Sequence, residues 1–315
     1  MSAEPSRREL LSWGGYGLTG AALSSLLQGK TKPNYTPSAK RVIHVCLMGG
    51  LRHLDSFDYK PELAKFHGKP FKSEKKPETF FNRIGPLRKN DWSFKRYGQS
   101  GLWVSDLFPH ISTVADELTV IRSMVADSAN HTPATFQQNT GFQLNGFPVM
   151  GSWVSYGLGS ESDDLPAYVV LPDSRGYPAG GTINWSNGFL PSRHQGVAFE
   201  SQGHPIPDLF PRREIPDRVE SAGRSLLGKL NQIDLSRYGA EDALLARIRS
   251  HELAAKMQLA VPEVTDVSQE TEAVRESYGI NGKETADFGK NCLLARRLMQ
   301  KGVRFVQIIS GGSFG

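Results

Sequence analysis

An apolar run followed by two glycines constrains the fold of this chain more than any other feature. The run covers Val42–Met48 and contains one histidine, and Gly49 and Gly50 follow it directly. A short apolar run that ends at glycines is typical of a strand buried on both faces of a sheet, as in parallel α/β folds. The glycines allow a sharp turn at the carboxyl end of the strand, where open α/β sheets place their ligands. We therefore expect a core strand that leads directly into a binding site.

Charged side chains follow this turn at short intervals. They are Arg52, His53, Asp55, Asp58 and Lys60. Carboxylate oxygens and an imidazole at a strand end are the donors that a divalent-metal or phosphate-type site would need. The alternative is an Asp-rich loop that caps the next element, which is the commonest role of a single Asp in such a place. Together with a second motif further along the chain, the group favours a site.

The second motif lies within residues 125–142. Asn130–Pro133 predicts a turn, and Pro133 suits the first turn of a helix that runs towards Thr140 and Gly141. A helix start at the carboxyl edge of a sheet suits an anion because its backbone N–H groups point outwards. His131 then has three alternative roles: metal ligand, ligand of an anionic ester, or cap of the turn.

Helices and strands are predicted to alternate along the chain. A helix, a glycine and a β-rich run near the carboxyl end repeat the pattern of the first half, which indicates an α/β fold. After residue 217, apolar residues recur at three- and four-residue steps, which is typical of helices. Predicted strands cover 42–48, 118–124, 167–171 and 303–310, and predicted helices cover 104–117, 133–141, 219–233, 241–259, 271–278 and 284–301, with a short one within 146–160.

Two segments are predicted to be irregular. Residues 62–91 are rich in Lys, Pro and Gly, and residues 172–216 are rich in Gly, Pro, Ser and Asn. A long loop region of the second kind tends to carry function, often as a lid or as part of a substrate wall. Because His194 and His204 in this region have no diagnostic spacing, we interpret both as surface histidines.

The first 40 residues resemble an export signal with a linker. Ser6, Arg7 and Arg8 precede an uncharged stretch, 10–29, that is rich in Gly, Ala, Leu and Ser. The arginine pair fits the twin-arginine pattern, with Leu10 in place of Phe. A membrane anchor is the alternative, but the glycines make the stretch too weakly apolar for one. We expect export through the twin-arginine pathway to the periplasm or cell envelope, and contact with the membrane only through this signal.

Composition argues against two classes of site. The net charge of +5 is mild for 315 residues, and the cationic residues are scattered, so we expect no nucleic-acid partner. Cys46 lies in the predicted first strand and Cys292 in a predicted helix. Two isolated cysteines make neither a CxxC metal site nor a disulfide framework, and we expect both to be core residues.

Five stretches resemble, in the same order, the sequences of one family. They are SRRELL at 6–11, HVCLMGGLRHLDSFDYKPEL at 44–63, NHTPATFQQNTG at 130–141, GFPVMGSWVSYGLGS at 146–160 and GVRFVQIISGG at 302–312. On these motifs the chain is identified as a member of the DUF1501 family of exported, sulfatase-like proteins related to the alkaline phosphatase superfamily. The resemblance implies a doubly wound, mostly parallel α/β sheet with metal and ester chemistry at the strand ends.

When the second motif is aligned with the sulfatase pattern, His131 occupies the position of the nucleophile. Ala134 and Thr135 stand where sulfatases have Ser and Arg. The resemblance therefore gives His131 a catalytic or metal-binding role, or makes it the phosphorylated group. It leaves Thr132 as the neighbouring catalytic hydroxyl, with Ser128 as a further candidate.

In the first motif, Leu51–Arg52 replaces the family's Pro-Ser. Arg52 can bind an anionic ester through its planar guanidinium, and we assign it to substrate binding together with His53. Asp55 and Asp58 match the family's Asp-x-Phe-Asp and are carried over, with His131, as ligands of a divalent metal (Zn, Ca, Mg or Mn).

The family's later Trp-Asp-x-His and Arg-Asp-His segments are absent from these 315 residues, and the chain stops at residues 311–315, directly after a predicted strand. We therefore expect a fragment: a signal and linker at 1–40, then a partial sulfatase-like domain at 41–315, incomplete at its carboxyl end.

Two functions follow from these expectations. The first is an exported, metal-dependent hydrolase of sulfate or phosphate esters, acting on an anionic ester or polysaccharide-type substrate, in which the metal polarises the ester and activates a hydroxyl or water. The second is a non-catalytic exported binding or assembly protein that keeps the fold but lacks the nucleophile. His131 and Arg52 favour the second and the two aspartates favour the first. By analogy of fold we expect the hydrolase-like function, with little activity in residues 30–315 alone.

Overall fold

The computed structural model describes residues 36–311, apart from 37, 75–78, 80–82, 201–204, 208, 210–214 and 240–241. The predicted export signal and His204 lie outside these residues. The chain divides into two compact units, Met1–Lys40 and Arg41–Gly315, and all elements described below belong to the second. Within the described ranges, every helix is too short or too polar to cross a membrane.

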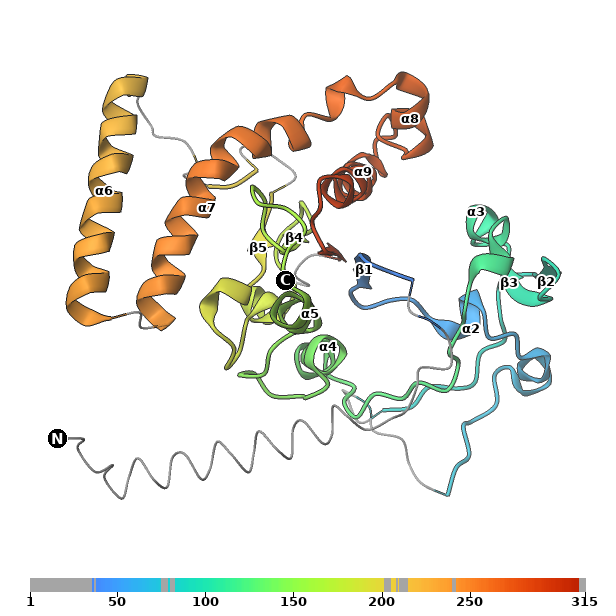
Figure 1. Ribbon diagram of the computed structural model, residues 1–315. Helices are drawn as coiled ribbons and strands as arrows, with labels where there is room; N and C mark the ends of the chain where they lie inside the picture. The colour runs from blue at the N-terminus through green and yellow to red at the C-terminus, as the bar shows by residue number, and fades with distance from the viewer. Residues whose placement is uncertain are drawn as a thin grey trace, which may run out of the picture. The chain divides into compact units, whose positions relative to one another are not determined.

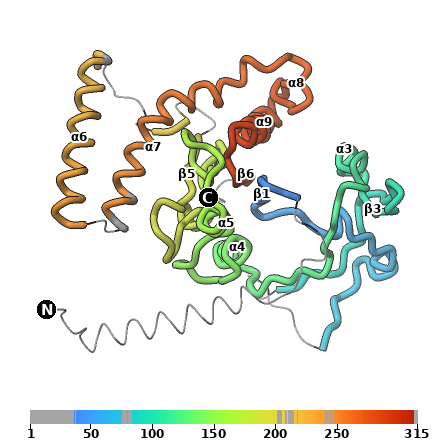
Figure 2. The backbone as a smooth tube through the Cα atoms, viewed as in Figure 1, coloured from blue at the N-terminus to red at the C-terminus, as the bar shows by residue number. Residues whose placement is uncertain are grey.

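A four-stranded parallel sheet organises the second unit (Figure 1). Its strands are β1 (Val42–Leu47), β4 (Tyr168–Leu171), β5 (Val197–Ala198) and β6 (Phe305–Ser310), in the order β1-β6-β4-β5. Figure 2 shows β6, from the red end of the chain, next to the blue β1. The parallel pairing, with helices between the strands, confirms the predicted α/β class.

The first strand forms where the sequence predicts it, but it is not buried on both faces. Among the described strands β1 pairs only with β6, which places it at the edge of the sheet. Its Ile43, Val45 and Leu47 are exposed, whereas Cys46 is buried. Burial on both faces requires a neighbouring strand on each side and a layer above and below. The prediction is wrong for β1 because β6 holds that interior position, and residues 305–309 of β6 are all buried.

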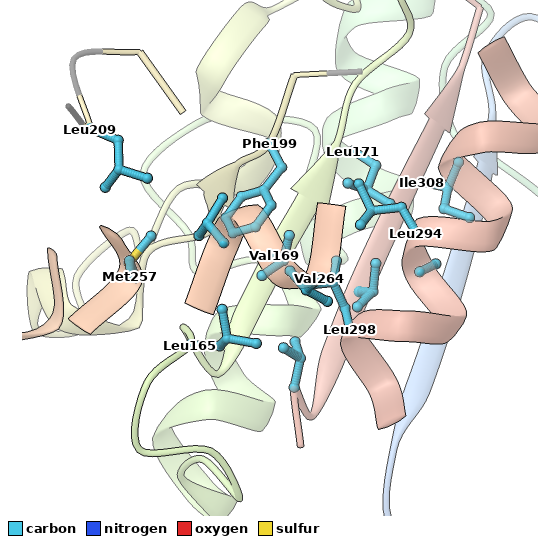
Figure 3. Close-up of a cluster of buried hydrophobic side chains, with 14 residues drawn as sticks. Leu165, Val169, Leu171, Phe199, Leu209, Met257, Val264, Leu294, Leu298 and Ile308 are labelled. Atoms are coloured by element: carbon cyan, nitrogen blue, oxygen red, sulfur yellow. The ribbon is translucent and has the colours of Figure 1, made fainter. Parts of the chain in front are cut away.

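One face of the sheet packs against α7 (Asp242–Thr265) and α9 (Ala286–Gln300). Figure 3 shows the core between them. The sheet contributes Val169, Leu171, Val306 and Ile308, and the two helices contribute Met257, Val261, Val264, Leu294, Ala295 and Leu298. Each fully buried aliphatic side chain of this size contributes about 1.5–3 kcal/mol relative to an exposed one. Cys292 packs at the margin of this core, as the sequence predicts.

The opposite face of the sheet packs against α5 (Met150–Leu158). Cys46, Tyr168 and Phe305 are buried on this side. A Cβ atom at Gly151 would lie 2.6 Å from the ring of Tyr168, so glycine is what allows the helix to approach the sheet this closely. Helices thus cover both faces, as in a doubly wound sheet.

The remaining helices largely follow the predicted periodicity. They are α2 (His53–Ser56), α3 (Pro109–Ser112), α4 (His131–Thr140), α6 (Asp217–Tyr238) and α8 (Glu272–Ser277). The predicted helices after residue 217 are confirmed as α6 to α9, with ends that shift by a few residues. The helix expected within 133–141 is α4, and the short helix expected within 146–160 is α5.

The segment between residues 94 and 124 differs from the prediction. In place of one helix over 104–117, β2 (Phe94–Tyr97) and β3 (Leu102–Ser105) form an antiparallel hairpin, followed by α3 and a 3-10 turn at Ala115–Glu117. The apolar spacing of Leu107, Ile111 and Val114 predicted one continuous helix, but only Pro109–Ser112 of this range is α-helical. The predicted strand at 118–124 is also wrong: this run has no strand partner and its apolar side chains are largely exposed.

Residues 172–216 are mostly irregular where the structure describes them, as predicted. They contain 3-10 turns at Gly181–Trp185 and Ser192–His194. They also contain β5, a two-residue strand that the sequence did not indicate, which pairs with Val169 and Val170. This segment therefore completes the sheet on the side opposite β1.

Candidate functional site

A pocket of about 850 Å³ lies at the carboxyl end of β1, and we call it the carboxyl-edge pocket. Its walls come from three segments: the strand end and turn at residues 47–52, residues 124–126, and the side of α4. The α4 side contributes His131, Ala134, Thr135, Gln137 and Gln138, and Gly141 after the helix. The pocket lies where the sequence predicted a binding site and joins the two sequence motifs, and binding there stays a prediction.

Hydrogen bonds hold the wall at residues 124–126 against α4. The backbone N–H of Asp127 donates to Oε1 of Gln137 at 3.0 Å, and Nε2 of Gln137 donates to the Asp127 carboxylate at 2.6 Å. On the strand side, the N–H of Met48 donates to the carbonyl of Ser310 at 2.7 Å, which extends the β1–β6 pairing to the pocket. The pocket is therefore shaped by bonded segments rather than by loose loops.

The cap of α4 is Asn130 and not His131. The Asn130 side chain accepts a hydrogen bond from the N–H of Thr132 at 3.2 Å, which is the usual role of an N-cap amide. Pro133 has no N–H, so the first turn offers an anion few backbone donors. This removes the cap from the alternatives for His131. Its side chain lies in the pocket wall, where the metal and ester roles remain open.

Arg52 brings the positive charge of the first motif into the pocket. Its side chain is about half exposed, and Nη1 lies 3.3 Å from Oδ2 of Asp55. An ion pair of that length and exposure contributes little to stability, because water and salt screen it. The guanidinium therefore retains most of its capacity to bind an anion in the pocket.

Asp58 and His53 lie in a neighbouring pocket of about 440 Å³. The Asp58 carboxylate accepts a hydrogen bond from Nζ of Lys60 at 2.6 Å and lies 3.9 Å from Nε2 of His53. The two pockets share Leu51 and Met124 as lining residues. His53, predicted to bind substrate with Arg52, is thus on the far side of the turn from it.

The predicted metal ligands do not come together. His131 lies in the carboxyl-edge pocket, Asp58 lies in the neighbouring one, and Asp55 and Asp58 each pair with a cation. In the part of the chain that the structure describes, no group of three or more His, Cys, Asp or Glu side chains is placed to hold a metal ion. The described residues therefore do not form a metal centre by themselves, and metal binding stays a prediction from the sequence.

The hydroxyl groups near His131 are placed differently from one another. Thr132 follows His131 in α4 but is not among the lining residues of the pocket. The Ser128 hydroxyl accepts a hydrogen bond from the N–H of Asn130 at 3.1 Å. Thr135 does line the pocket, but it is buried and donates to the carbonyl of His131 at 2.7 Å. The catalytic role predicted for Thr132 stays a prediction.

A buried chain of hydrogen bonds, missed by the sequence reasoning, holds α4 to the sheet. The hydroxyl of Tyr168 donates to Oε1 of Gln307, and Nε2 of Gln307 donates to Oδ1 of Asn139 at 3.1 Å. Asn139 in turn donates to Oδ1 of Asn184 at 3.2 Å. Burial raises the pKa of the Tyr168 phenol well above its usual value, with a smaller effect from Cys46, so it acts as a neutral donor. The polar residue Gln307 inside the apolar run of β6 was the available signal.

Asp173 was also missed, although it lies just past the carboxyl end of β4. Its carboxylate accepts hydrogen bonds from the Arg175 side chain at 2.7–2.8 Å and from the N–H of Gly311 at 2.7 Å. These bonds, the Arg175 side chain foremost, lower the pKa of the carboxyl to about 2. Asp173 therefore fastens the end of β6 to the end of β4. An Asp two residues after a core strand was the signal that could have found it.

A different pocket, of about 790 Å³, lies at the amino ends of β4 and β5, and we call it the amino-edge pocket. His194 in its wall is only 8% exposed, so its interpretation as a surface histidine is wrong. Its Nε2 accepts a hydrogen bond from Nε of Arg193 at 3.0 Å. Because an arginine can only donate, Nδ1 carries the proton and donates to the Ser155 hydroxyl at 2.9 Å. A general base needs the opposite arrangement, so this Ser–His pair is structural.

Comparison with known proteins gives one finding. A family model described as "Protein of unknown function (DUF1501)" matches residues 39–314. Neither the curated proteins nor the solved structures contain a match to the chain.

Proposed function

The chain belongs to the DUF1501 family, and we propose that it is an exported protein that binds a sulfate or phosphate ester in the carboxyl-edge pocket. Of the two functions expected from the sequence, this is the binding function, and the geometry favours it over hydrolysis. The observation that carries it is the presence of Arg52 and His131 in one pocket at the carboxyl ends of parallel strands. The ligand would be an anionic ester, free or on a polysaccharide.

Arg52 supplies the recognition of the anion. Its guanidinium offers several N–H donors in one plane, which matches the oxygens of a sulfate or phosphate group. The loose ion pair with Asp55 can open when a better anion enters, because the 3.3 Å contact is weak and solvated. His131 lines the same cavity from α4, so an imidazole and a guanidinium share one pocket wall.

The rest of the pocket limits what kind of ester fits. Apolar and amide side chains line most of the remaining wall, among them Met48, Val125 and Gln138. Within that lining, Arg52 and His131 are the two side chains that can carry positive charge. Such a wall suits an ester whose neutral part packs beside the charged group, and offers little to free inorganic phosphate.

Metal-dependent hydrolysis of the same ester, in an alkaline phosphatase or sulfatase type of fold, is the second candidate function. Asp58 and His53, 3.9 Å apart next to the pocket, favour it because they are two donors of the type that divalent metals prefer. A bound metal would polarise the ester and activate water. Asp55 and His131 are further donors in the turn and in α4, but the described residues do not bring the four together.

Export is part of the proposal and rests on Arg7 and Arg8 in the amino-terminal signal. Replacing both with Lys should abolish transport of a fused reporter to the periplasm, because the twin-arginine pathway reads the arginine pair itself. Transport that is unaffected by the change would show that export does not depend on this pathway.

Calorimetric titration with p-nitrophenyl sulfate and p-nitrophenyl phosphate tests the ligand site. Arg52→Ala should weaken binding by about 10- to 100-fold, because a hydrogen bond to a charged group contributes about 1.5–3 kcal/mol. The matched control is Lys65→Ala, which also removes one cation but at an exposed site outside the pocket. Equal affinities for the two variants would refute the site.

The same two esters test hydrolysis, with Zn²⁺, Ca²⁺, Mg²⁺ or Mn²⁺ added in turn. Release of p-nitrophenol by the wild type, lost in both Asp58→Asn and His131→Ala, would establish the second candidate function. Binding without turnover in any of the four metals would leave the protein as an ester-binding protein.

A further inference from the structure

Five aromatic side chains, four of them exposed and Phe147 half-buried, form a continuous row beside the carboxyl-edge pocket, and we call it the aromatic platform. It consists of Phe142, Phe147, Phe189, Trp153 and Tyr156, in spatial order. Successive ring centroids lie 4.0, 6.5, 5.7 and 6.2 Å apart. Phe189 is 65% exposed, Tyr156 53% and Trp153 45%. A soluble protein rarely exposes so many contiguous aromatic groups without an interaction partner.

The platform is built on the outer side of α5. Met150, Trp153 and Tyr156 are exposed, whereas Gly151 and Ser152 are buried against the sheet. Trp153 therefore lies on the outer side of α5, and Tyr156 on the same side also packs edge-on against the buried ring of His194, with 5.4 Å between the centroids. Neither the export signal nor the ester site accounts for them.

A groove of about 590 Å³ connects the platform to the ester site. Its lining comes from α4, α5 and the residues beside them, and includes Trp153. Gln137, Gln138 and Gly141 line both this groove and the carboxyl-edge pocket. A ligand longer than a single ester could therefore extend from Arg52 across the carboxyl-terminal half of α4 to Trp153.

The groove is mostly apolar and uncharged. Its lining contains amide, hydroxyl, apolar and aromatic groups, and no Asp, Glu, Lys, Arg or His. Three polar groups on or beside the platform make no hydrogen bond within the described ranges: the Gln138 amide, the Trp153 indole N–H and the Tyr156 hydroxyl. They are available to a ligand that presents both apolar faces and hydroxyl groups.

We propose that the aromatic platform and its groove bind the neutral sugar rings of a saccharide chain whose sulfate or phosphate ester lies in the carboxyl-edge pocket. The proposal rests on the proposed function and names its substrate class. Sugar rings have an apolar C–H face that packs on an aromatic ring and hydroxyl groups at the rim that bond to amides. A membrane surface would call for Lys or Arg beside the aromatic residues, and the groove has none.

The test uses the full chain and three probes: p-nitrophenyl sulfate, a neutral galactan oligosaccharide, and the same oligosaccharide carrying sulfate esters. Trp153→Ala should weaken binding of the sulfated oligosaccharide by about tenfold, the effect of losing one aromatic contact of about 1–1.5 kcal/mol. It should leave binding of p-nitrophenyl sulfate unchanged. The matched control is Trp92→Ala, which removes an equally exposed indole (41%) outside the platform.

The outcomes separate this inference from the proposed function. Arg52→Ala should weaken both sulfated probes, whereas Trp153→Ala should weaken only the one with sugar rings. The neutral oligosaccharide could bind in a way that depends on Trp153 while p-nitrophenyl sulfate fails to bind. That result would support saccharide binding by the aromatic platform and refute the ester site. Equal saccharide affinity in Trp153→Ala and Trp92→Ala would overturn the platform. Vesicle binding or self-association that depends on Trp153, without saccharide binding, would overturn it as well.

Discussion

The two large pockets at opposite edges of the sheet differ in how firmly their polar side chains bond to one another. In the amino-edge pocket, both ring nitrogens of His194 are engaged, one by Ser155 and the other by Arg193. In the carboxyl-edge pocket, Arg52 makes only a long, exposed ion pair, and His131 lies in the wall of the cavity beside it. Polar groups that satisfy one another stabilise a fold, whereas polar groups that face a cavity can bind a ligand.

This comparison makes a general prediction about substitutions. Changes in the amino-edge pocket should alter stability and leave ester binding intact, and changes to Arg52 should do the opposite. Substitutions in the elements between the two pockets should alter both stability and ester binding. The four predictions below run from the largest expected effect to the smallest.

Gln307→Leu should have the largest effect because Gln307 is the middle of the buried chain that holds α4 to the sheet. The substitution leaves the Tyr168 hydroxyl without its acceptor and Oδ1 of Asn139 without its donor. With about 1–3 kcal/mol for each of the two unsatisfied buried groups, the free energy of unfolding should fall by about 2–6 kcal/mol. Urea denaturation measures it, and Gln300→Leu at the exposed end of α9 is the control. A change no larger than the control's would mean that the chain contributes little.

Gly151→Ala should follow, at about 1–3 kcal/mol of destabilisation from overpacking. The new methyl group would meet the Tyr168 ring at 2.6 Å, and the ring cannot move away easily because its hydroxyl is bonded to Gln307. Gly157→Ala in the same helix meets nothing within 4 Å and should be neutral or slightly stabilising. The melting temperatures of the two variants, measured by thermal unfolding under the same conditions, test this prediction. Equal melting temperatures would contradict the close packing of α5.

Ser155→Ala should destabilise the fold by about 1–2 kcal/mol, because Nδ1–H of His194 loses its acceptor in a buried place. Binding of p-nitrophenyl sulfate should not change, since Ser155 lines only the amino-edge pocket. Urea denaturation measures the stability and calorimetric titration measures the ester affinity, both on the same preparation. A loss of ester binding at full stability would instead make Ser155 and His194 the functional pair.

The smallest effect concerns pH. Burial, and then the charge of Arg193, lower the pKa of His194, and burial also lowers that of His44. The folded state therefore binds fewer protons than the unfolded one below about pH 6.5, so stability is fully present above that pH and declines as the pH falls. His194→Gln should make this decline shallower between about pH 7.5 and about pH 5.5. Urea denaturation of the wild type and His194→Gln across this pH range measures the decline, and equal slopes would contradict the account.

Much of the fold was predictable because hydrophobic period and glycine position are local signals. The run 42–48, the helices after residue 217 and the turn at Asn130–Pro133 each have a pattern that belongs to one kind of element. The hairpin β2–β3 was not predictable in this way, because two four-residue strands give too few residues to separate a period of two from a period of 3.6.

The burial and pairing of a strand depend on contacts between residues that are distant in the sequence, and the prediction of these two properties was wrong for β1. The apolar composition of β1 predicted an interior strand, yet the interior position belongs to β6 from the other end of the chain. In the candidate site, too, local features were predictable and contacts between distant residues were not. Arg52 and His131 were found because each lies at a local turn signal. The division of Asp58 and His131 between two pockets was not visible, because it depends on how the turn after β1 folds back.

The most direct test of the account is a double comparison of Arg52→Ala and Ser155→Ala, with ester affinity and unfolding free energy measured for each. We predict that Arg52→Ala loses about 10- to 100-fold in affinity for p-nitrophenyl sulfate at nearly unchanged stability. Ser155→Ala should lose stability at unchanged affinity. If the ester binds Arg52→Ala as tightly as it binds the wild type, or if Ser155→Ala is the variant that loses ester affinity, the carboxyl-edge pocket is not the functional site of this protein.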